Sequence, residues 1–193
     1  MALVKAMYSM GKTTRGIHPT KQTYRPFVAW KSMLRRCYYE PYLIENINYR
    51  GCIVCAEWLD YQVFADWFTK QVGFTLGWEL DKDLLANKAG ISDKIYSPDY
   101  CVLLSKRLNA MLITNTRNKN NFPVGVTLTK SGRYTAHCKD ANSKTQALGT
   151  FTTVADASIA YQAYKKVIFK SIVDIYKDDL EPETYLALIN YTA

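Results

Sequence analysis

Apolar residues recur at helical spacing in the first third of the chain. Within residues 25–38 the apolar positions are Phe27, Trp30, Met33, Leu34 and Cys37. This spacing predicts a helix with one buried face. Pro26 would then lie in its first turn, and Lys31, Arg35 and Arg36 on its polar face.

A second helix is predicted over residues 61–72, with Asp60 as its N-cap. Its inward positions would be Val63, Phe64, Trp67 and Phe68. Residues 39–59 between the two helices show no period and are predicted to be irregular. Beyond the second helix the pattern changes. Residues 78–85 and 101–105 favour short strands, and residues 106–113 favour a helix with Leu108, Met111 and Leu112 inward. The middle of the chain is therefore predicted to contain a strand–loop–strand–helix unit.

Alternating patterns appear only after an asparagine-rich polar segment at 114–123, which predicts a linker. Strands are expected at 124–128, 133–138 and 146–150, with the first turn at 130–132. Thr153 is the expected N-cap of a following helix with Ala157, Ala160 and Tyr161 on its apolar stripe. A short helix with Tyr185, Leu186 and Ile189 inward is expected to begin at residues 181–183.

These elements predict an α+β protein. Its N-terminal part would be a helical, ββα-metal-like domain, followed by a three-stranded antiparallel sheet packed on a helix. The expected divisions are a basic leader at 1–24, the first domain at 25–113, the linker at 114–123, the sheet-plus-helix domain at 124–170 and an acidic C-terminal helix at 171–193.

Charge separates along the chain in a way that favours nucleic acid as a partner. The net charge is +8, and residues 1–36 hold eight Lys or Arg with no Asp or Glu. Residues 114–170 hold nine basic and two acidic side chains, whereas residues 171–193 hold one and five. Two basic segments of this kind supply the sequence-independent part of DNA binding, which weakens with salt. The alternative is that these lysines and arginines are only solvated surface.

The C-terminal segment carries a family resemblance. The motifs GV-x-L-x-K-x-G-R-Y-x-A, L-G-T-F-x-T and A-x-x-A-Y within residues 122–170 resemble the DNA-binding domain of the plant APETALA/ethylene-response-factor type. That domain also forms the C-terminal half of phage endonucleases and places its sheet in the DNA major groove. The resemblance implies a DNA face made by Lys130, Arg133, Tyr134, His137, Lys144 and Gln146. Strand alternation puts Arg133, Thr135 and His137 on one face, which we expect to be the open one, because Ala136 and Cys138 suit a helix-packed face.

Residues 30–112 carry a second resemblance. The motifs W-x-x-M-L-x-R-C-Y, V-C-x-E-W, W-E-L-D-K-D, Y-S-P-D-x-C-V and L-N-x-x-L are similar to those of phage HNH-type endonucleases. That family uses a strand–loop–strand–helix unit around one divalent metal. The resemblance implies that Asp81 and Asn109 hold Mg²⁺, that Lys82 and Asp83 orient water or stabilise charge on the phosphate, and that Arg35, Arg36, Lys106 and Arg107 contact phosphates.

The chain departs from the HNH pattern at the general base, because Lys82 stands where that family has a histidine. A lysine is charged at neutral pH unless it is strongly desolvated, so it accepts no proton from water. The two histidines, His18 and His137, lie in the leader and in the expected sheet. Asp81, Lys82 and Asp83 would alternatively form a solvated strand end or an internal ion pair.

Five cysteines form no regular framework, and Cys37, Cys52, Cys55 and Cys101 would be the ligands of a structural zinc site. Buried free thiols are the favoured alternative, because a single C-x-x-C motif is weak evidence and cysteine is often buried. Free thiols, the lack of a signal-peptide pattern and the lack of a membrane-spanning segment lead us to expect a cytoplasmic protein.

Three kinds of function remain open from the sequence. The first is a homing endonuclease that uses Mg²⁺ to hydrolyse double-stranded DNA. The second is an inactive relative that binds DNA as a regulator, or that inhibits a host enzyme. The third is a protein–protein adaptor whose basic surfaces contact an acidic host protein or a surface that mimics nucleic acid. The missing histidine favours the second and third, whereas the presence of Asp81 and Asn109 favours the first.

Overall fold

The computed structural model describes residues 21–88, 90, 94–112 and 122–191. Most of the expected leader, including His18, and most of the expected linker lie outside these residues. The described chain forms two compact units. Unit 1 comprises the chain up to Asn109 together with Asp179–Ala187, and unit 2 comprises Ala110–Asp178 together with the chain from Leu188 onward.

The core of unit 1 forms where two helices predicted from periodicity pack together. Helix α2 (Lys21–Tyr38) buries Trp30, Met33 and Leu34 at 1% exposure each. Helix α4 (Tyr61–Lys70) buries Phe64 and Phe68 against it. The side chain of Asp60 accepts the Gln62 N–H at 2.9 Å, so the predicted N-cap of α4 is confirmed.

Two details of these helices differ from the sequence prediction. Helix α2 begins four residues before Arg25, so that Pro26 lies inside the helix and not in its first turn. Val63, predicted to point inward, is 46% exposed, because the buried face of α4 is narrow and is centred on Tyr61, Phe64 and Phe68.

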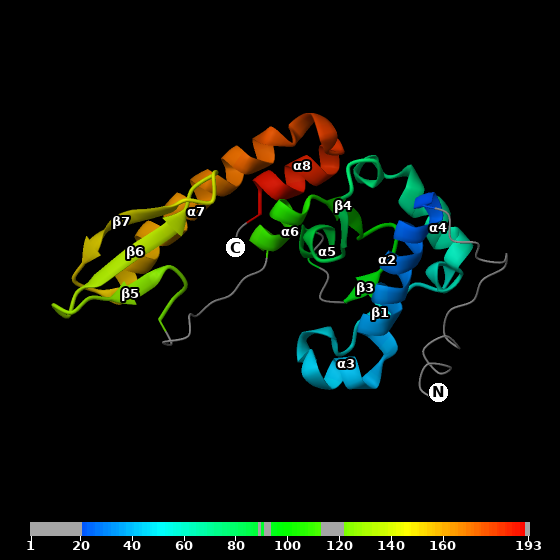
Figure 1. Ribbon diagram of the computed structural model, residues 1–193, viewed down its shortest axis with the longest axis horizontal. Helices are drawn as coiled ribbons and strands as arrows, with labels where there is room; N and C mark the ends of the chain where they lie inside the picture. Colours follow the sequence, from blue (N-terminus) through cyan, green and yellow to red (C-terminus); the bar gives the residue numbers. More distant parts are fainter. Residues whose placement is uncertain (1–20, 89, 91–93, 113–121, 192–193) are drawn as a thin grey trace. The chain divides into compact units, whose positions relative to one another are not determined.

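Short elements connect the long ones in unit 1 (Figure 1). The segment predicted to be irregular contains helix α3 (Glu40–Glu45), strand β1 (Ile53–Val54) and two 3₁₀ turns, η1 (Ile47–Tyr49) and η2 (Glu57–Leu59). A further 3₁₀ turn, η3 (Val72–Phe74), follows α4. Strand β1 pairs in parallel with β3 (Ile95–Tyr96). Two-residue strands have no period, so the sequence pattern did not show them.

The strand–loop–strand–helix unit predicted for the middle of the chain is present. Strand β2 (Glu79–Asp81) pairs antiparallel with β4 (Val102–Leu104), and β4 leads into α6 (Lys106–Leu112). The short helix α5 (Leu84–Lys88) follows β2. All three residues of β4 are buried, and Leu108 of α6 is fully buried.

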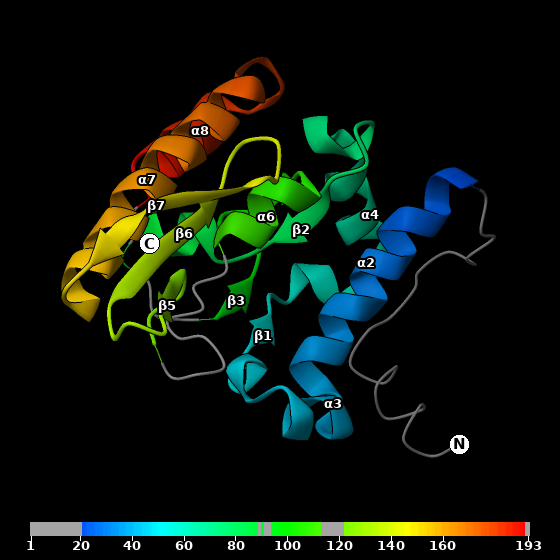
Figure 2. The ribbon, with the colours of Figure 1, turned by 60° about the vertical axis from the view of Figure 1, so that its left-hand side comes forward.

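Unit 2 contains the predicted three-stranded antiparallel sheet, packed on a helix. The sheet order is β5 (Val126–Leu128), β6 (Tyr134–Lys139) and β7 (Thr145–Phe151). Val126 and Ala136 of the sheet pack on Ala157 of helix α7 (Val154–Ile175), and all three are fully buried. Figure 2 shows α7 running along one side of this sheet. The α+β fold class predicted from the sequence is therefore confirmed.

The turns and caps of unit 2 follow their sequence signals. The Thr153 hydroxyl accepts the Asp156 N–H at 3.1 Å and caps α7 as predicted. Gly132 has a φ of +79° in the β5–β6 turn. Helix α7 continues to Ile175, past the position where the sequence suggested a separate acidic segment. A 3₁₀ turn, η4 (Lys177–Asp179), then leads to α8 (Pro182–Ile189), in which Leu186 is 53% exposed although it was predicted to point inward.

Candidate functional site

Asp81 ends strand β2, and its side chain acts as a local cap. The residue is 8% exposed. Its Oδ1 accepts the backbone N–H groups of Asp83 at 3.1 Å and Leu84 at 2.9 Å, at the start of α5. Burial raises the pKa of the Asp81 carboxyl, and these two hydrogen bonds oppose that shift. One carboxylate oxygen is therefore already committed to the backbone of the chain.

Lys82, at the position of the expected catalytic histidine, is buried with 7% of its side chain exposed. Its ammonium donates a hydrogen bond to Asp83 Oδ1 and lies 5.8 Å from the centre of the Tyr96 ring. Burial by itself lowers the pKa of Lys82, but the hydrogen bond and charge of Asp83 outweigh burial, so that the pKa is raised. Lys82 is consequently a fixed cation at neutral pH and not a proton acceptor.

The surroundings of Asp81 fit a metal ion poorly. Within the residues that the structure describes, no three His, Cys, Asp or Glu side chains lie together as a metal site. Asp81 caps a helix, Asp83 pairs with Lys82, and the ammonium of Lys82 would repel a cation. Asn109 lies on α6 in the same unit, and its backbone N–H bonds to the Ser105 carbonyl at 3.0 Å. Mg²⁺ is usually held by one or two carboxylates together with waters and substrate phosphates, and here the Asp81 carboxylate already accepts two backbone N–H groups and lies beside the residue Lys82, which is a cation.

The cysteines are free thiols. Burial raises the pKa of Cys37 to about 12 and raises the pKa of Cys52, Cys55 and Cys101 as well. Zinc binds the thiolate form of cysteine, and burial in apolar surroundings disfavours this form. The fifth cysteine, Cys138, lies on β6 in unit 2.

The open face of the sheet in unit 2 carries the residues predicted to contact DNA. Arg133, Thr135 and His137 lie on the face opposite to buried Ala136. Their side chains are held by neighbouring strands. The guanidinium of Arg133 donates to the Thr150 carbonyl at 3.1 Å, and His137 Nε2 lies 3.1 Å from the Thr127 hydroxyl. The open face therefore presents polar side chains that hydrogen bonds hold in position.

Tyr134, also predicted to contact DNA, lies on the helix-packed side of the sheet. Its ring packs against the core of unit 2 and makes an edge contact with Phe122, with ring centres 5.8 Å apart. Alternation along β6 separates Tyr134 from Arg133 and His137. The structure therefore gives Tyr134 a packing role and does not bring it onto the open face.

The two sheet turns present the remaining predicted contacts. Lys130 and Lys144 are exposed at the β5–β6 and β6–β7 turns. In the second turn Asp140 Oδ1 accepts the N–H groups of Asn142 and Lys144, both at 2.9 Å. Asp140 Oδ2 accepts the side-chain amide of Gln146 at 2.8 Å, and this bond is the main reason why the Asp140 pKa is lowered. Gln146 is therefore held by Asp140, but because it pairs with Cys138 it lies on the face opposite to His137 and not on the open face.

The residues of unit 1 that were predicted to contact phosphates differ in how exposed their side chains are. Arg35 and Lys106 are exposed, whereas Arg36 and Arg107 are partly buried. Arg36 forms a side-chain hydrogen bond with Tyr96, and its pKa is raised because the tyrosines around it outweigh the opposing effect of burial. Tyr96 itself is 1% exposed. The sequence pattern did not suggest any role for Tyr96, because it lies on the two-residue strand β3.

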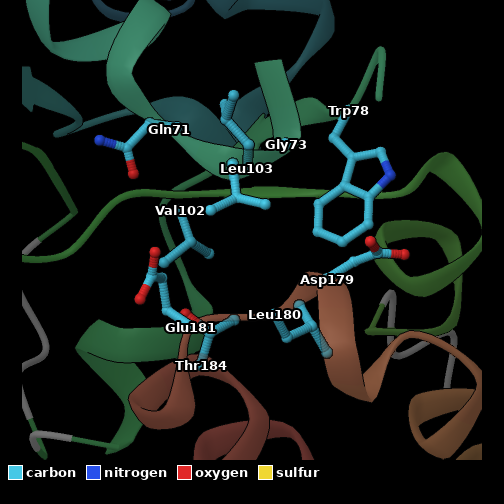
Figure 3. Close-up of a pocket in the computed structure, with 10 residues that line it drawn as sticks. Gln71, Gly73, Trp78, Val102, Leu103, Asp179, Leu180, Glu181 and Thr184 are labelled. Atoms are coloured by element: carbon cyan, nitrogen blue, oxygen red, sulfur yellow. The ribbon is translucent and has the colours of Figure 1, made fainter. Parts of the chain in front are cut away.

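One hollow in unit 1 lies apart from these residues (Figure 3). Gly73, Trp78 and Leu103 line one side of it, and Leu180, Glu181 and Thr184 line the other. Its volume of about 50 Å³ is far below that of small-molecule sites, which measure roughly 300–1,000 Å³. It accommodates water and not a nucleotide.

Comparison with known proteins yields no match: no protein family, curated protein or solved structure matches this chain. Among the described residues, none of the helices combines the length and the apolar character needed to cross a bilayer.

Proposed function

We propose that this protein binds double-stranded DNA through the open face of the β5–β6–β7 sheet. The observation that carries the proposal is the arrangement of exposed Arg133 and half-buried Thr135 and His137 on one face of the sheet, with Lys130 and Lys144 exposed at its two turns. A small basic sheet of this kind fits the major groove, where side chains reach base edges and phosphates. The resemblance of residues 122–170 to a DNA-binding domain family supports the same proposal.

The contacts of this face suggest that some of its side chains bind phosphates and that others bind base edges. Lys130 and Lys144 are exposed cations suited to phosphates, and contacts with phosphates fix the register of the protein on DNA. Arg133 and His137 are held on this face by contacts with Thr150 and Thr127, whereas Gln146 pairs with Cys138 and lies on the opposite face. Side chains in fixed positions are suited to base edges, because they lose little conformational entropy on binding.

Replacing three cations of this face should weaken duplex binding. For Lys130→Ala/Arg133→Ala/Lys144→Ala we expect a loss of affinity on the order of tenfold to a hundredfold, and a reduced salt dependence, because fewer counterions are released. Fluorescence anisotropy with a labelled duplex across a salt titration measures both quantities.

The matched control removes as much positive charge from elsewhere in unit 2. Lys166, Lys170 and Lys177 are exposed, and the first two lie on α7. An equal loss of affinity for the triple alanine variant at these positions would show that net charge, and not the sheet face, determines binding. If the wild-type protein fails to bind duplex at low salt, the proposal is wrong.

A second proposal is metal-dependent cleavage of the bound DNA. The observation that favours it is the β2–loop–β4–α6 unit, which has Asp81 at the end of β2 and Asn109 on α6. The buried Lys82 ammonium and the capping role of Asp81 weigh against it. We therefore favour a DNA-binding relative of HNH-type endonucleases that does not cleave.

Supercoiled plasmid with Mg²⁺ or Mn²⁺ separates the two proposals. The variant to compare is Asp81→Asn, because its amide oxygen can still cap α5 while the negative charge is lost. Without cleavage chemistry, wild type and variant leave the plasmid intact. Nicking by wild type that EDTA abolishes and that Asp81→Asn reduces by roughly a hundredfold or more would establish the endonuclease. Equal nicking by both proteins would exclude Asp81 as a metal ligand.

A further inference from the structure

Two consecutive arginines at the end of α2 lie over a pair of touching tyrosines. The guanidinium of Arg35 is 4.8 Å from the centre of the Tyr42 ring, and that of Arg36 is 5.5 Å from the centre of the Tyr49 ring. The two rings are in contact, with centres 5.8 Å apart and planes at 49°. Tyr42 comes from α3 and Tyr49 from η1, which follow α2 directly in the chain. Figure 2 shows α3 beside the end of α2.

The two arginines have different roles in this cluster. Arg36 is partly buried and is tied to the Tyr96 side chain, so it anchors Tyr49 to the core of unit 1. Arg35 is exposed, and its guanidinium also lies 5.9 Å from the Tyr39 ring. The inner half of the cluster is therefore anchored to buried Tyr96, whereas Arg35 is exposed and Tyr39 and Tyr42 are half-buried.

The surroundings of the cluster combine apolar and cationic groups. Ile44 and Ile47 are 64% and 66% exposed, which is unusual for isoleucines unless a partner covers them. Lys94 donates to the Asn48 carbonyl at 2.7 Å and places another cation nearby. Helix α3 also carries Glu40 and Glu45, so that general attraction of anions is limited. A ligand for this surface must gain most of its affinity from stacking.

We propose that Arg35, Tyr39 and Tyr42 form a stacking site for an unpaired base of single-stranded DNA. The proposal deepens the DNA-binding function, on which it rests, but it uses a different unit of the protein. A base presents a flat ring that stacks on tyrosine or on a guanidinium, and its phosphate complements Arg35. In a duplex the faces of the bases are already stacked on one another, so the site requires an unpaired base.

The test compares two oligonucleotides with the same backbone charge. One is a labelled oligothymidylate of about 15 nucleotides, and the other is an abasic strand of the same length. We expect the wild-type protein to bind oligothymidylate roughly tenfold more tightly than the abasic strand in fluorescence anisotropy. Tyr42→Ala should abolish this preference, whereas Tyr42→Phe, which retains the ring, should keep it.

Arg35→Lys separates stacking from charge. This variant keeps the positive charge but loses the planar guanidinium, so it should reduce the preference for bases while leaving abasic binding unchanged. Tryptophan fluorescence of each variant verifies that unit 1 is folded. Equal binding of the two strands by wild type would overturn the proposed site, as would a full base preference in the folded Tyr42→Ala variant.

The outcomes also separate this inference from the proposed function. Duplex binding that depends on Lys130, Arg133 and Lys144, together with no base preference, refutes only the stacking site. A base preference that depends on Tyr42, without duplex binding, refutes the sheet-face proposal and leaves the stacking site standing. If the protein binds neither duplex DNA nor the single-stranded oligonucleotide, both proposals fail.

Discussion

Gly125→Ala should destabilise unit 2 by about 3 kcal/mol, through two separate costs. Gly125 has a φ of +79°, a region that costs an L-residue about 1 kcal/mol. A Cβ atom at this position would also overlap the Tyr161 ring and lie 2.7 Å from the His137 carbonyl oxygen. The same backbone holds the sheet together, because the Gly125 carbonyl accepts the His137 N–H at 2.7 Å. Relief of the overlap must therefore move either α7 or the sheet.

Gly132→Ala is the control for this prediction. Gly132 has the same φ of +79°, but a Cβ atom there would meet nothing within 4 Å. It should therefore cost only about 1 kcal/mol. Hydrogen exchange of amides in β5, β6 and β7 measures the stability of unit 2 directly. Equal losses for the two variants would show that the overlap with Tyr161 has no energetic effect. DNA affinity should fall only for Gly125→Ala, because only that variant disrupts the sheet at the strand that carries His137.

Trp30→Ala should cost about 3–5 kcal/mol in unit 1. The Trp30 side chain is 1% exposed, and its ring lies 5.5 Å from the Tyr61 ring. Its indole Nε1 donates to the Trp58 carbonyl at 2.7 Å, which joins α2 to the turn before α4. Truncation would remove a large side chain from the α2–α4 contact and leave a buried carbonyl without its donor.

Trp30→Phe separates packing from hydrogen bonding. Phenylalanine keeps most of the ring but cannot donate to Trp58, so the loss should be smaller, about 1–3 kcal/mol. Urea unfolding followed by the fluorescence of Trp58, Trp67 and Trp78 reports on unit 1, because every tryptophan of the chain lies there. A loss below about 1 kcal/mol for Trp30→Ala would contradict the packing described here.

Local signals explain why much of the fold could be predicted. Helix α2 places Trp30, Met33 and Leu34 inward, as its spacing indicates. The caps at Asp60 and Thr153 act over two or three residues and formed as expected. On β6, small buried Ala136 was sufficient to indicate which face is open. Each of these features depends on neighbours within one element.

The candidate sites required the tertiary structure. The sequence has Lys82 at the position where the family resemblance predicts a general base. Only the fold shows that Lys82 is buried, pairs with Asp83 and lies beside the Tyr96 ring. The family resemblance implied that Asp81 holds a metal, and only the fold shows that one oxygen of its carboxylate accepts two backbone N–H groups at the start of α5. Tyr134 was assigned to DNA by motif, and the packing of Phe122 gives it another role.

The sequence by itself determined the order of the main helices and strands, the α+β class and the open face of the sheet, because hydrophobic period, turn glycines and caps act within a few residues. Only the tertiary structure decided the charge state of Lys82 and the hydrogen bonds that the Asp81 carboxylate accepts from the backbone. It also decided the contacts of Arg35 with Tyr42 and of Arg36 with Tyr49. The physical reason is that burial and pairing depend on residues that other elements bring together. A pKa or a stacking contact follows from those neighbours and not from the period of the chain.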